Sequence, residues 1–478
     1  GHHPGTSCPA PPPQGGDNDK IAFCSYFWYN AFYGDIREKQ IMIKKKTKKK
    51  KTIFDTSELE ITDEIRGALE VMENTHDTVY ITGKAGTGKS TLLKHFCRDT
   101  TKKIAIVAPT GVAAINVGGM TIHSFFKFPF GILEESDVEF LYSKKELFQN
   151  LDTLVIDEVS MVRADMMNAI DLSLRKNTGN VNLPFGGVQV IMFGDLYQLP
   201  PVVTSTEDRE HLIQTYDGVY FFKAPVFIAL ELRKINLNKI FRQKNDEVFV
   251  NVLNNIRECR TTQTDLVALN DRVRVYDEKL GPAILLATTN RIVDSINKTE
   301  LEKIKQKEYT YKYEVSGDFD IKKSPAEQKL KLKNGAQIMM IKNDNQVPRR
   351  WGNGTLGTVL ALKKNKIIVS IGKEIHEIEK ATWDDFEYQY DAEEHTVERL
   401  SKGSFMQYPI KLAWAVTIHK SQGKTFDRVI IDLGRGAFAH GQTYVALSRC
   451  TTLKEIYMKK PVRFSDIILD DEVRDFHT

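Results

Sequence analysis

Eight residues from Gly83 to Ser90 could hold a nucleoside triphosphate. They read Gly-Lys-Ala-Gly-Thr-Gly-Lys-Ser and match the pattern G-x-x-x-x-G-K-[ST] in full. Glycines let successive backbone N–H groups face phosphate oxygens without a β-carbon in the way. In such a loop the lysine reaches the β and γ phosphates and the last hydroxyl ligates Mg²⁺. The predicted nucleotide contacts are Gly83, Gly86, Thr87, Gly88, Lys89, Ser90 and Thr91, and Ser90 is also a predicted magnesium ligand.

Two adjacent acids follow an apolar stretch further along the chain. The apolar stretch Leu154–Ile156 is followed directly by Asp157 and Glu158. A buried strand with a carboxylate at its tip can deliver that group to a nucleotide-bound Mg²⁺, and Asp157 is predicted to do so. Glu158 is then the group that orients and deprotonates the attacking water. The pair predicts that the chain hydrolyses the nucleotide itself.

Three more polar residues could sense the γ-phosphate, namely Gln198, Arg242 and Arg449. A positively charged side chain that contacts the γ-phosphate in the transition state raises the rate of hydrolysis by roughly 10³–10⁵-fold. An arginine taken alone is usually a surface ion-pair residue, and Gln198 taken alone better fits loop packing. Their assignment therefore depends on the family resemblance described below.

Parallel sheets are needed to position these residues. From Leu59 onward, short apolar strands alternate with helical stretches, which is typical of a parallel α/β sheet. Each strand ends in Gly, Pro or an acidic residue, at the sheet edge where such folds bind ligands. The predicted strands are Thr78–Thr82, Ile104–Ala108, Leu154–Ile156 and Val188–Phe193, and a helix is predicted from Thr91 to Cys97.

A second set of elements begins after Arg233. The predicted strands are Ile284–Ala287, Gln337–Ile341, Leu412–Val416 and Val429–Asp432, with helices at Glu247–Arg257 and Arg291–Lys305. Between about Tyr309 and Lys402 the pattern changes to short alternating strands separated by glycine turns, such as Asn353-Gly354. This pattern predicts a small antiparallel β-barrel inserted into the second core.

Composition sets broad limits on the class of protein. The 478 residues are 41% hydrophobic and 27% charged, as in globular proteins with more than one core. The net charge of +4 neither requires nor excludes a nucleic-acid partner. No apolar run approaches the 18 or so residues of a membrane span. The five cysteines are scattered, so no structural zinc site is predicted.

The first 57 residues differ from the rest of the chain. A proline-rich stretch leads to an aromatic run and then to a lysine block from Lys44 to Lys51. Blocks of like charge are usually solvated, so we predict a disordered tail, and its first residues resemble a cloning remnant. An accessory nucleic-acid-binding arm is the alternative.

The motifs occur in the order of a known family. The chain resembles superfamily-one helicases of the RecD/PIF branch, and most of all the PIF family (petite integration frequency DNA helicases), from about Leu59 to Pro461. The matching blocks in the first half are Gly83–Ser90, Ala108–Ala114, Thr121–Phe125, Asp157–Met161, Pro184–Gln189 and Gly194–Pro201. In the second half they are Phe241-Arg242, Asn353-Gly354, Thr417–Gly423 and Tyr444–Arg449.

The resemblance implies an α/β fold with two RecA-like parallel-sheet cores, ATP between them, and a small SH3-like β-barrel as the insert. It makes Gln198, Arg242 and Arg449 the γ-phosphate sensors. It also makes Gln422 and Gly423 nucleotide contacts. The expected parts are a tail over 1–57, a first core over 58–230 with a wedge-like insertion at about 118–148, a second core over 231–308 and 403–465, the barrel over 309–402, and a C-terminal tail over 466–478.

The implied activity is an ATP- and Mg²⁺-dependent DNA helicase that moves 5′ to 3′ on single-stranded DNA. Small side chains at a strand end suit phosphate oxygens, and aromatic faces suit bases. The predicted DNA contacts are Pro109, Thr110, Gly111, Val112, His123, Phe126, Trp351, Asn353, Thr417, His419 and Lys420. At least one of Phe125 and Phe126 should instead pack in the core, and His419 could be an interior histidine. The segment Lys127–Lys145, with Phe128-Pro129-Phe130, is the predicted strand-separating wedge.

Expected partners are single-stranded DNA and tailed or forked duplexes, with G-quadruplex DNA as a family expectation. We expect a monomer in the bacterial cytoplasm or the nucleus. Two alternatives stay open, a RecD-like motor subunit of a nuclease complex and a P-loop NTPase without a DNA track. One position departs from the family, since Ile65 follows Ile61–Glu64 where relatives carry a glutamine that reads adenine. Looser discrimination among nucleoside triphosphates is therefore expected.

Overall fold

The computed structural model describes residues 62–203, 205–239, 246–321, 324–346 and 349–477. Residues Thr56–Thr478 form one compact unit. The predicted tail over 1–57 and Arg242 lie outside the described residues. Within the described ranges, no helix has the length and apolar character that crossing a membrane requires.

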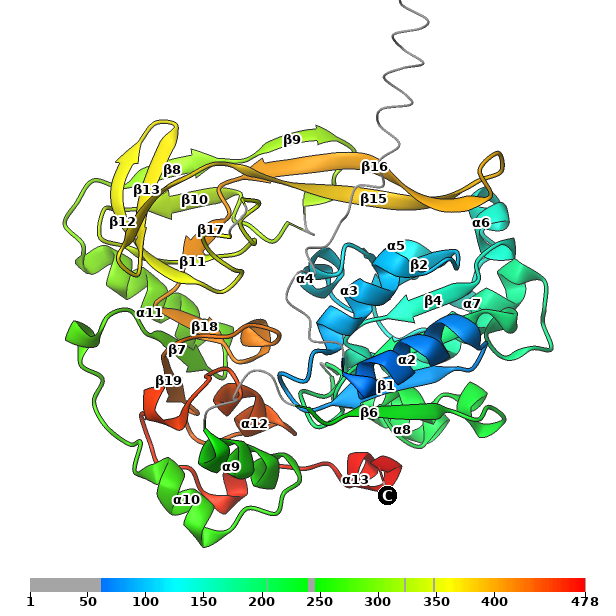
Figure 1. The fold of residues 1–478 in the computed structure, drawn as a ribbon, viewed down its shortest axis with the longest axis horizontal. Helices are drawn as coiled ribbons and strands as arrows, with labels where there is room; N and C mark the ends of the chain where they lie inside the picture. The colour runs from blue at the N-terminus through cyan, green and yellow to red at the C-terminus, as the bar shows by residue number, and fades with distance from the viewer. Residues whose placement is uncertain (1–61, 204, 240–245, 322–323, 347–348, 478) are drawn as a thin grey trace, which may run out of the picture. The chain divides into compact units, whose positions relative to one another are not determined.

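The first core is a parallel sheet of six strands in the order β3-β2-β4-β5-β1-β6 (Figure 1). Its strands are β1 (Val79–Gly83), β2 (Ile104–Ala108), β3 (Met120–Thr121), β4 (Thr153–Ile156), β5 (Gln189–Phe193) and β6 (Arg233–Leu237). β6 pairs in parallel with β1, Val79 opposite Arg233. The predicted boundary between the cores at residue 230 is therefore placed too early.

Both faces of this sheet are covered by helices. Val79 and Ile81 belong to the apolar cluster beneath α2 and α3, whereas Tyr80 between them belongs to the cluster beneath α7. Side chains alternate across a strand, so a strand covered on both faces must be apolar throughout. The helices are α2 (Asp63–Asn74), α3 (Lys89–Asp99), α4 (Gly111–Asn116), α5 (Ile122–Phe126), α6 (Lys145–Gln149), α7 (Ala164–Thr178) and α8 (Thr206–Tyr216).

The second core is a smaller parallel sheet in the order β18-β7-β19-β20. Its strands are β7 (Ile284–Ala287), β18 (Ala415–Thr417), β19 (Val429–Asp432) and β20 (Ile456–Met458). The helix α11 (Asn290–Lys303) packs on one face through Val293. The other face is covered by α9 (Glu247–Arg257), α10 (Gln263–Asn270) and α12 (Gln442–Leu447).

The insert is built from antiparallel strands. They are β8 (Tyr309–Lys312), β9 (Glu314–Gly317), β10 (Lys329–Leu332), β11 (Gln337–Met340), β12 (Leu356–Lys363), β13 (Lys366–Ile371), β14 (Glu374–Ile378), β15 (Ala381–Asp391), β16 (Thr396–Gln407) and β17 (Ile410–Leu412). They form a five-stranded sheet in the order β14-β13-β12-β11-β17, a three-stranded sheet β15-β16-β9 and the pair β10-β8. Antiparallel strands were expected here, and closure into an SH3-like barrel stays a prediction.

Two strands predicted for the second core were assigned wrongly. β11, within the predicted strand Gln337–Ile341, pairs antiparallel with β12 and β17 and so lies in the insert. The predicted strand Leu412–Val416 is interrupted, because β17 ends at Leu412 in the insert and β18 begins at Ala415 in the parallel sheet. The insert therefore runs past the predicted limit at residue 402. A short apolar strand has the same pattern whichever sheet it joins.

The hairpin of β15 and β16 runs from the insert to the first core, where β15 contacts α6 (Figure 1). Tyr388 on β15 is buried, and its hydroxyl accepts a hydrogen bond from the N–H of Ile106 on β2 at 2.9 Å. Nearby, the Nζ of Lys144 lies 3.6 Å from an Oε1 of Glu387. The insert is thus anchored on the first core as well as on the second.

The predicted C-terminal tail contains a packed helix, α13 (Asp471–His477). Phe476 stacks on Phe222 of the first core with ring centroids 4.2 Å apart. The Tyr220 hydroxyl donates to Asp470 at 3.0 Å. The chain therefore leaves the second core and ends against the first.

Candidate active site

The phosphate-binding loop joins β1 to α3, as its sequence pattern predicts. The Nζ of Lys89 donates to the carbonyl oxygens of Gly83 at 2.5 Å and Lys84 at 3.1 Å. Gly86 and Gly88 have φ values of +84° and +89°, a region that residues with a β-carbon rarely adopt. The lysine ammonium therefore lies against the backbone that would cradle the phosphates.

The two acids of the site follow β4. Desolvation, and then the neighbouring Glu158 carboxylate, raise the pKa of Asp157 to about 7. Desolvation also raises the pKa of Glu158, while the charges of Lys89 and Arg449 oppose that shift. Glu158 has φ +53° and ψ +42°, a left-handed conformation that is uncommon for a residue with a side chain and is often kept at functional sites.

A divalent cation would suit this pair of carboxylates, because two acids with raised pKa values need more positive charge than Lys89 supplies. In the part of the chain that the structure describes, no group of three His, Cys, Asp or Glu side chains could hold a metal alone. Mg²⁺ at phosphate sites takes only one or two protein oxygens, with phosphates and water as its other ligands. Asp157 and the exposed hydroxyl-bearing Ser90 fit that requirement.

Residues from both cores meet beside these acids. The Nε2 of Gln422, from the second core, donates to Glu158 Oε2 and to Gln198 Oε1, each at 3.2 Å. The Nε2 of Gln198 in turn donates to Asp195 Oδ2 at 3.1 Å. Glu158, predicted to activate the attacking water, is therefore in contact across the two sheets with Gln422, which also contacts Gln198. Both glutamines were predicted to sense the nucleotide.

The remaining second-core predictions are placed less directly. Arg449 is fully buried and donates to backbone carbonyls, including Val445 at 2.8 Å and Lys424 at 3.2 Å. Its charge still acts on Glu158, whose pKa it lowers. Gly423 is exposed beside Gln422. The role of Arg449 as a γ-phosphate sensor stays a prediction.

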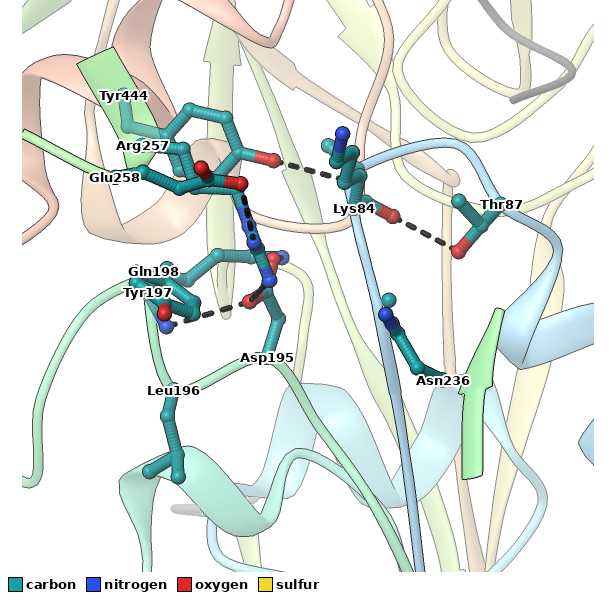
Figure 2. Close-up of polar contacts among 12 residues, drawn as sticks. Lys84, Thr87, Asp195, Leu196, Tyr197, Gln198, Asn236, Arg257, Glu258 and Tyr444 are labelled. Carbon is teal, nitrogen blue, oxygen red and sulfur yellow. Dashed lines mark hydrogen bonds and ion pairs between the residues drawn. The ribbon is translucent and has the colours of Figure 1, made fainter. Parts of the chain in front are cut away.

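Two further contacts between the cores carry no sequence signal (Figure 2). The N–H of Ala85, inside the phosphate loop, donates to the hydroxyl of Tyr444 on α12 at 2.9 Å. The Nη2 of Arg257, at the end of α9, donates to Asp195 Oδ1 at 2.9 Å. Arg257 and Asp195 are 62 residues apart, and no local pattern links such positions. The block that contains Tyr444 was recognisable, but the target of its hydroxyl was not.

The predicted DNA contacts of the first core lie at the carboxyl end of β2. Thr110 caps α4, its Oγ1 accepting from the N–H of Ala113 at 3.2 Å. Pro109 and Gly111 are half-buried and Val112 is exposed. These groups occupy one sheet edge and remain accessible.

His123 lies further along, half-buried, with its ring stacked on Phe130 at 4.9 Å between centroids. Phe130 is 89% exposed. Together they form an accessible aromatic surface that includes Phe130 of the predicted wedge, and of the two only His123 was predicted as a DNA contact.

The structure contradicts the stacking role predicted for Phe126. This side chain is 2% exposed, stacked on Phe128 at 5.2 Å and edge-on to Phe125 at 4.8 Å. Trp351 was also predicted to touch DNA, but it is 7% exposed and packs against His376 in the core of the insert. Large aromatic side chains gain most from burial, which sequence spacing alone could not exclude here.

The other predicted DNA contacts of the second half are mixed. Thr417 is buried, and its Oγ1 accepts from the N–H of Lys420 at 3.2 Å, so its hydroxyl shapes the turn and does not face solvent. Lys420 is exposed and His419 half-buried. Asn353 Nδ2 donates to Asn116 Oδ1 at 3.4 Å, which connects the insert to α4.

Residues 38–266 match the family described as PIF1-like helicase. The ATP-dependent DNA helicase Pif1 of Bdellovibrio bacteriovorus is 34% identical over 420 residues, which cover 85% of this chain and 89% of that protein. The human ATP-dependent DNA helicase PIF1 is 32% identical, over 79% of this chain and 57% of the human protein. The chain thus spans nearly all of the bacterial relative and little more than half of the human one.

Solved structures of Pif1 from Bacteroides resemble this fold. The unliganded protein superposes with a TM-score of 0.79 at 39% identity, over 88% of this chain and 97% of that one. The complex with ADP-AlF4 gives 0.80, and the complex with single-stranded DNA gives 0.65, at 38% identity and the same coverage. With two parallel-sheet cores that meet at a phosphate-binding loop, and with these identities, the chain belongs to the PIF1-like helicase family.

Proposed function

We propose that this protein is an ATP-dependent DNA helicase that hydrolyses ATP where its two parallel-sheet cores meet. The observation that carries the proposal is the contact of Gln422 with both Glu158 and Gln198, because it joins the nucleotide chemistry of one core to the other. The relatives named above are ATP-dependent DNA helicases, and the Bacteroides relative has been solved with ADP-AlF4 and with single-stranded DNA.

In this proposal the loop residues Gly83, Gly86, Thr87, Gly88 and Thr91 bind the phosphates, and Lys89 neutralises the β and γ phosphates. The hydroxyl of Ser90 and the carboxylate of Asp157 hold Mg²⁺, which when bound supplies positive charge to the phosphate oxygens.

Glu158 orients the attacking water and takes its proton, for which a raised pKa is favourable. Gln198 and Gln422 detect the γ-phosphate from the two cores. Gly423, Arg242 and Arg449 complete the second-core side, the arginines acting on the charge that develops on the γ-phosphate.

The proposed DNA track runs along the edge that carries Thr110, Gly111 and Val112 and continues over His419 and Lys420 of the second core. Single strands are bound through backbone phosphates and by stacking, which is worth roughly 1–3 kcal/mol per base. The stacked pair of His123 and Phe130 is the proposed stacking surface. Pro109 and Asn353 border the track.

Movement along this track follows from alternation of the two cores. ATP favours the state in which Gln198, Gln422 and the arginines all contact the γ-phosphate, and hydrolysis removes that preference. Each round advances the grip by about one nucleotide, in the 5′-to-3′ direction. The segment Lys127–Lys145, with Phe130 and Tyr142 exposed, separates the strands at a fork.

The partners in this proposal are single-stranded, tailed and forked DNA, and also G-quadruplex DNA. The protein acts as a monomer, in the bacterial cytoplasm or the nucleus. Another solved Pif1 structure that resembles this fold concerns DNA unwinding at forked double-stranded DNA by two coordinating Pif1 helicases. The proposal of a monomer can therefore be tested by measuring the sedimentation of the protein with and without forked DNA.

The deciding experiment compares ATP hydrolysis with and without single-stranded DNA. A strong increase with DNA is expected, because the track and the nucleotide site share both cores. A rate that DNA leaves unchanged would overturn the motor proposal. Unwinding of a 5′-tailed fork, with no unwinding of a matched 3′-tailed fork, tests the direction.

A further inference from the structure

We propose that Arg257, from the second core, is a positioning residue that sets the orientation of the Gln198 amide in the first core by acting through Asp195. The inference rests on the proposed role of Gln198 at the γ-phosphate. No hydrogen bond or ion pair joins Arg257 to the phosphate loop or to the two acids, although its charge adds to desolvation in lowering the pKa of Lys84 in that loop. Its effect on the Gln198 amide passes through Asp195.

The contact between Arg257 and Asp195 is buried on both sides. Arg257 is 8% exposed and Asp195 is 1% exposed, with Nη2 and Oδ1 2.9 Å apart. The guanidinium carbon also lies 3.9 Å from the centroid of the Tyr197 ring. Figure 2 shows these side chains side by side. An arginine held by a carboxylate and an aromatic face has little freedom to move alone.

Asp195 passes this constraint to Gln198. Its Oδ1 also accepts from the N–H of Tyr197 at 3.3 Å, and its Oδ2 accepts from Gln198 Nε2 at 3.1 Å. A carboxylate can only accept, so the amide must turn its NH₂ group toward Asp195. The carbonyl oxygen of Gln198 then faces Gln422, at 3.2 Å. The orientation of the sensing amide thus depends on the charge of Asp195.

Arg257 keeps that charge in place. Desolvation acts to raise the pKa of Asp195, but Arg257 and then Lys89 outweigh it, so the pKa is lowered. Without Arg257 a buried carboxyl group tends to take up a proton. A protonated Asp195 would donate a hydrogen bond, which Gln198 could satisfy only by turning its amide over.

Other titratable groups face Asp195 from the elements around it. They are Lys84, Lys89, Glu158, Tyr80, Tyr444, His440 and His477. Desolvation lowers the pKa of His477 to about 4 and also lowers that of His440, so both stay neutral near pH 7. Desolvation raises the pKa of Tyr444 to about 12. His477, His440 and Tyr444 therefore keep the same charge near neutral pH. In the absence of Arg257, we expect Asp195 to take up a proton in this pH range.

The constraint comes from the opposite core. α9 is fixed in the second core by buried Phe249, Val252 and Ile256. Asp195 follows β5 of the first core. Withdrawal of the second sheet would carry Arg257 away from Asp195 and release the amide. Gln198 would then be correctly oriented only when the two cores are together.

The second core also grips the backbone of the same segment. His440 Nε2 lies 2.6 Å from the carbonyl oxygen of Leu196. Gly441, with φ +68°, lies so close that a β-carbon there would collide with the carbonyl oxygens of Tyr197 and Gln198. Backbone contacts hold the position of this segment, and Arg257 adds the charge that orients its amide.

The test is the pH dependence of DNA-stimulated ATP hydrolysis by Arg257→Met. We expect kcat to fall about tenfold to a hundredfold while KM for ATP changes little. The ratio of variant to wild-type kcat should fall as pH decreases from about 9 to about 6, because Asp195 becomes protonated. Arg260→Met is the matched control, since Arg260 is 74% exposed and forms its ion pair with Glu258 and not with Asp195. The ratio of the Arg260→Met kcat to the wild-type kcat should stay constant with pH.

Rescue separates positioning from a structural role. In the double variant Arg257→Met/Asp195→Asn the titrating group is gone, so the kcat ratio should no longer depend on pH. Arg257→Lys keeps the charge and should follow the wild-type pH profile. If the methionine variant does not fold, judged by its melting temperature, Arg257→Gln replaces it with the same expected pH dependence. A reduced but pH-independent ratio in Arg257→Met or Arg257→Gln would overturn the inference.

Gln198→Ala distinguishes the two proposals. A wild-type rate in this variant would mean that Gln198 is not needed for hydrolysis, and the proposed role of Gln198 would fail. A slow Gln198→Ala enzyme, combined with a flat pH ratio for Arg257→Met, would remove only the positioning role of Arg257.

Discussion

The two parallel sheets of this protein share a strand-then-helix arrangement but differ in the turn that follows β1 in the first and β7 in the second. In the first core, β1 is followed by the glycine-rich loop and α3. In the second, β7 is followed by Thr288 and Thr289 and then by α11. Only the first turn has the glycines that allow several N–H groups to converge on a phosphate.

The second core contributes side chains in place of a loop. Gln422, Tyr444 and Arg257 all reach groups of the first core. Loss of a residue of the phosphate loop should therefore abolish ATP hydrolysis. Loss of a second-core residue should slow ATP hydrolysis only to the extent that the contact between the two cores depends on that residue. The four predictions below test this difference.

The largest effect is expected for Lys89→Ala. Without its ammonium group the charge on the β and γ phosphates is not balanced, and kcat should fall by at least about 10³-fold. Binding of single-stranded DNA, measured by fluorescence anisotropy, should change little because the proposed track lies on other residues. Lys298→Ala, an exposed lysine on α11 of the second core, is the control and should hydrolyse ATP normally. Strong hydrolysis by Lys89→Ala would contradict the assignment of the loop.

Glu158→Gln should come next, with kcat lowered roughly 10²–10⁴-fold. The amide keeps the shape of the side chain and can still contact Gln422, but it cannot take a proton from water. ATP should therefore remain bound, and a rapid filtration assay should recover unhydrolysed ATP with the protein. Fast release of ATP, at the wild-type rate of turnover, would show that another group activates the water.

Local features of the sequence predicted several elements of both cores well. β2, β7, β19 and α9 have the predicted bounds, because an apolar run or a helical repeat needs no knowledge of its partner. The loop Gly83–Ser90 carries its function in eight consecutive residues. Glu158, Gln198 and Gln422 were also named in advance, although only the structure shows that they touch.

Features that depend on distant partners could not be predicted in this way. The boundary expected at residue 230 put the residues of β6 in the second core, where no strand was predicted for them, and their side chains are mostly exposed. β11 was placed in the second core because an apolar strand does not indicate which sheet it will join. Phe126 and Trp351 have the residue types of a base-stacking site, but their burial is decided by packing. The contact between Arg257 and Asp195 depends on two sheets coming together, and no sequence spacing encodes it.

A smaller effect is expected for Tyr444→Phe. The change leaves the buried N–H of Ala85 without its partner, which costs roughly 1–3 kcal/mol. The nucleotide-free protein should melt at a lower temperature, and the difference from wild type should shrink with a non-hydrolysable ATP analogue if phosphate takes over that N–H. In the control Tyr311→Phe, the lost bond goes to Lys363 inside the insert, so nucleotide should not affect the difference. A decrease in melting temperature that the ATP analogue leaves unchanged in Tyr444→Phe, as in Tyr311→Phe, would contradict this expectation.

The smallest effect concerns recognition of the nucleotide base through residue 65 of the first core. Ile65, where the family resemblance leads us to expect glutamine, is 1% exposed and lies with Ala68 and Met72 on the buried face of α2. Its neighbour Glu64 already accepts hydrogen bonds from the backbone and side chain of Asn238, each at 3.1 Å. A hydrocarbon side chain cannot tell adenine from guanine by hydrogen bonding, and it is such bonding that gives large discrimination. We expect kcat/KM for GTP within about tenfold of that for ATP, and turnover with ATP alone would mean that a residue other than Ile65 reads the base.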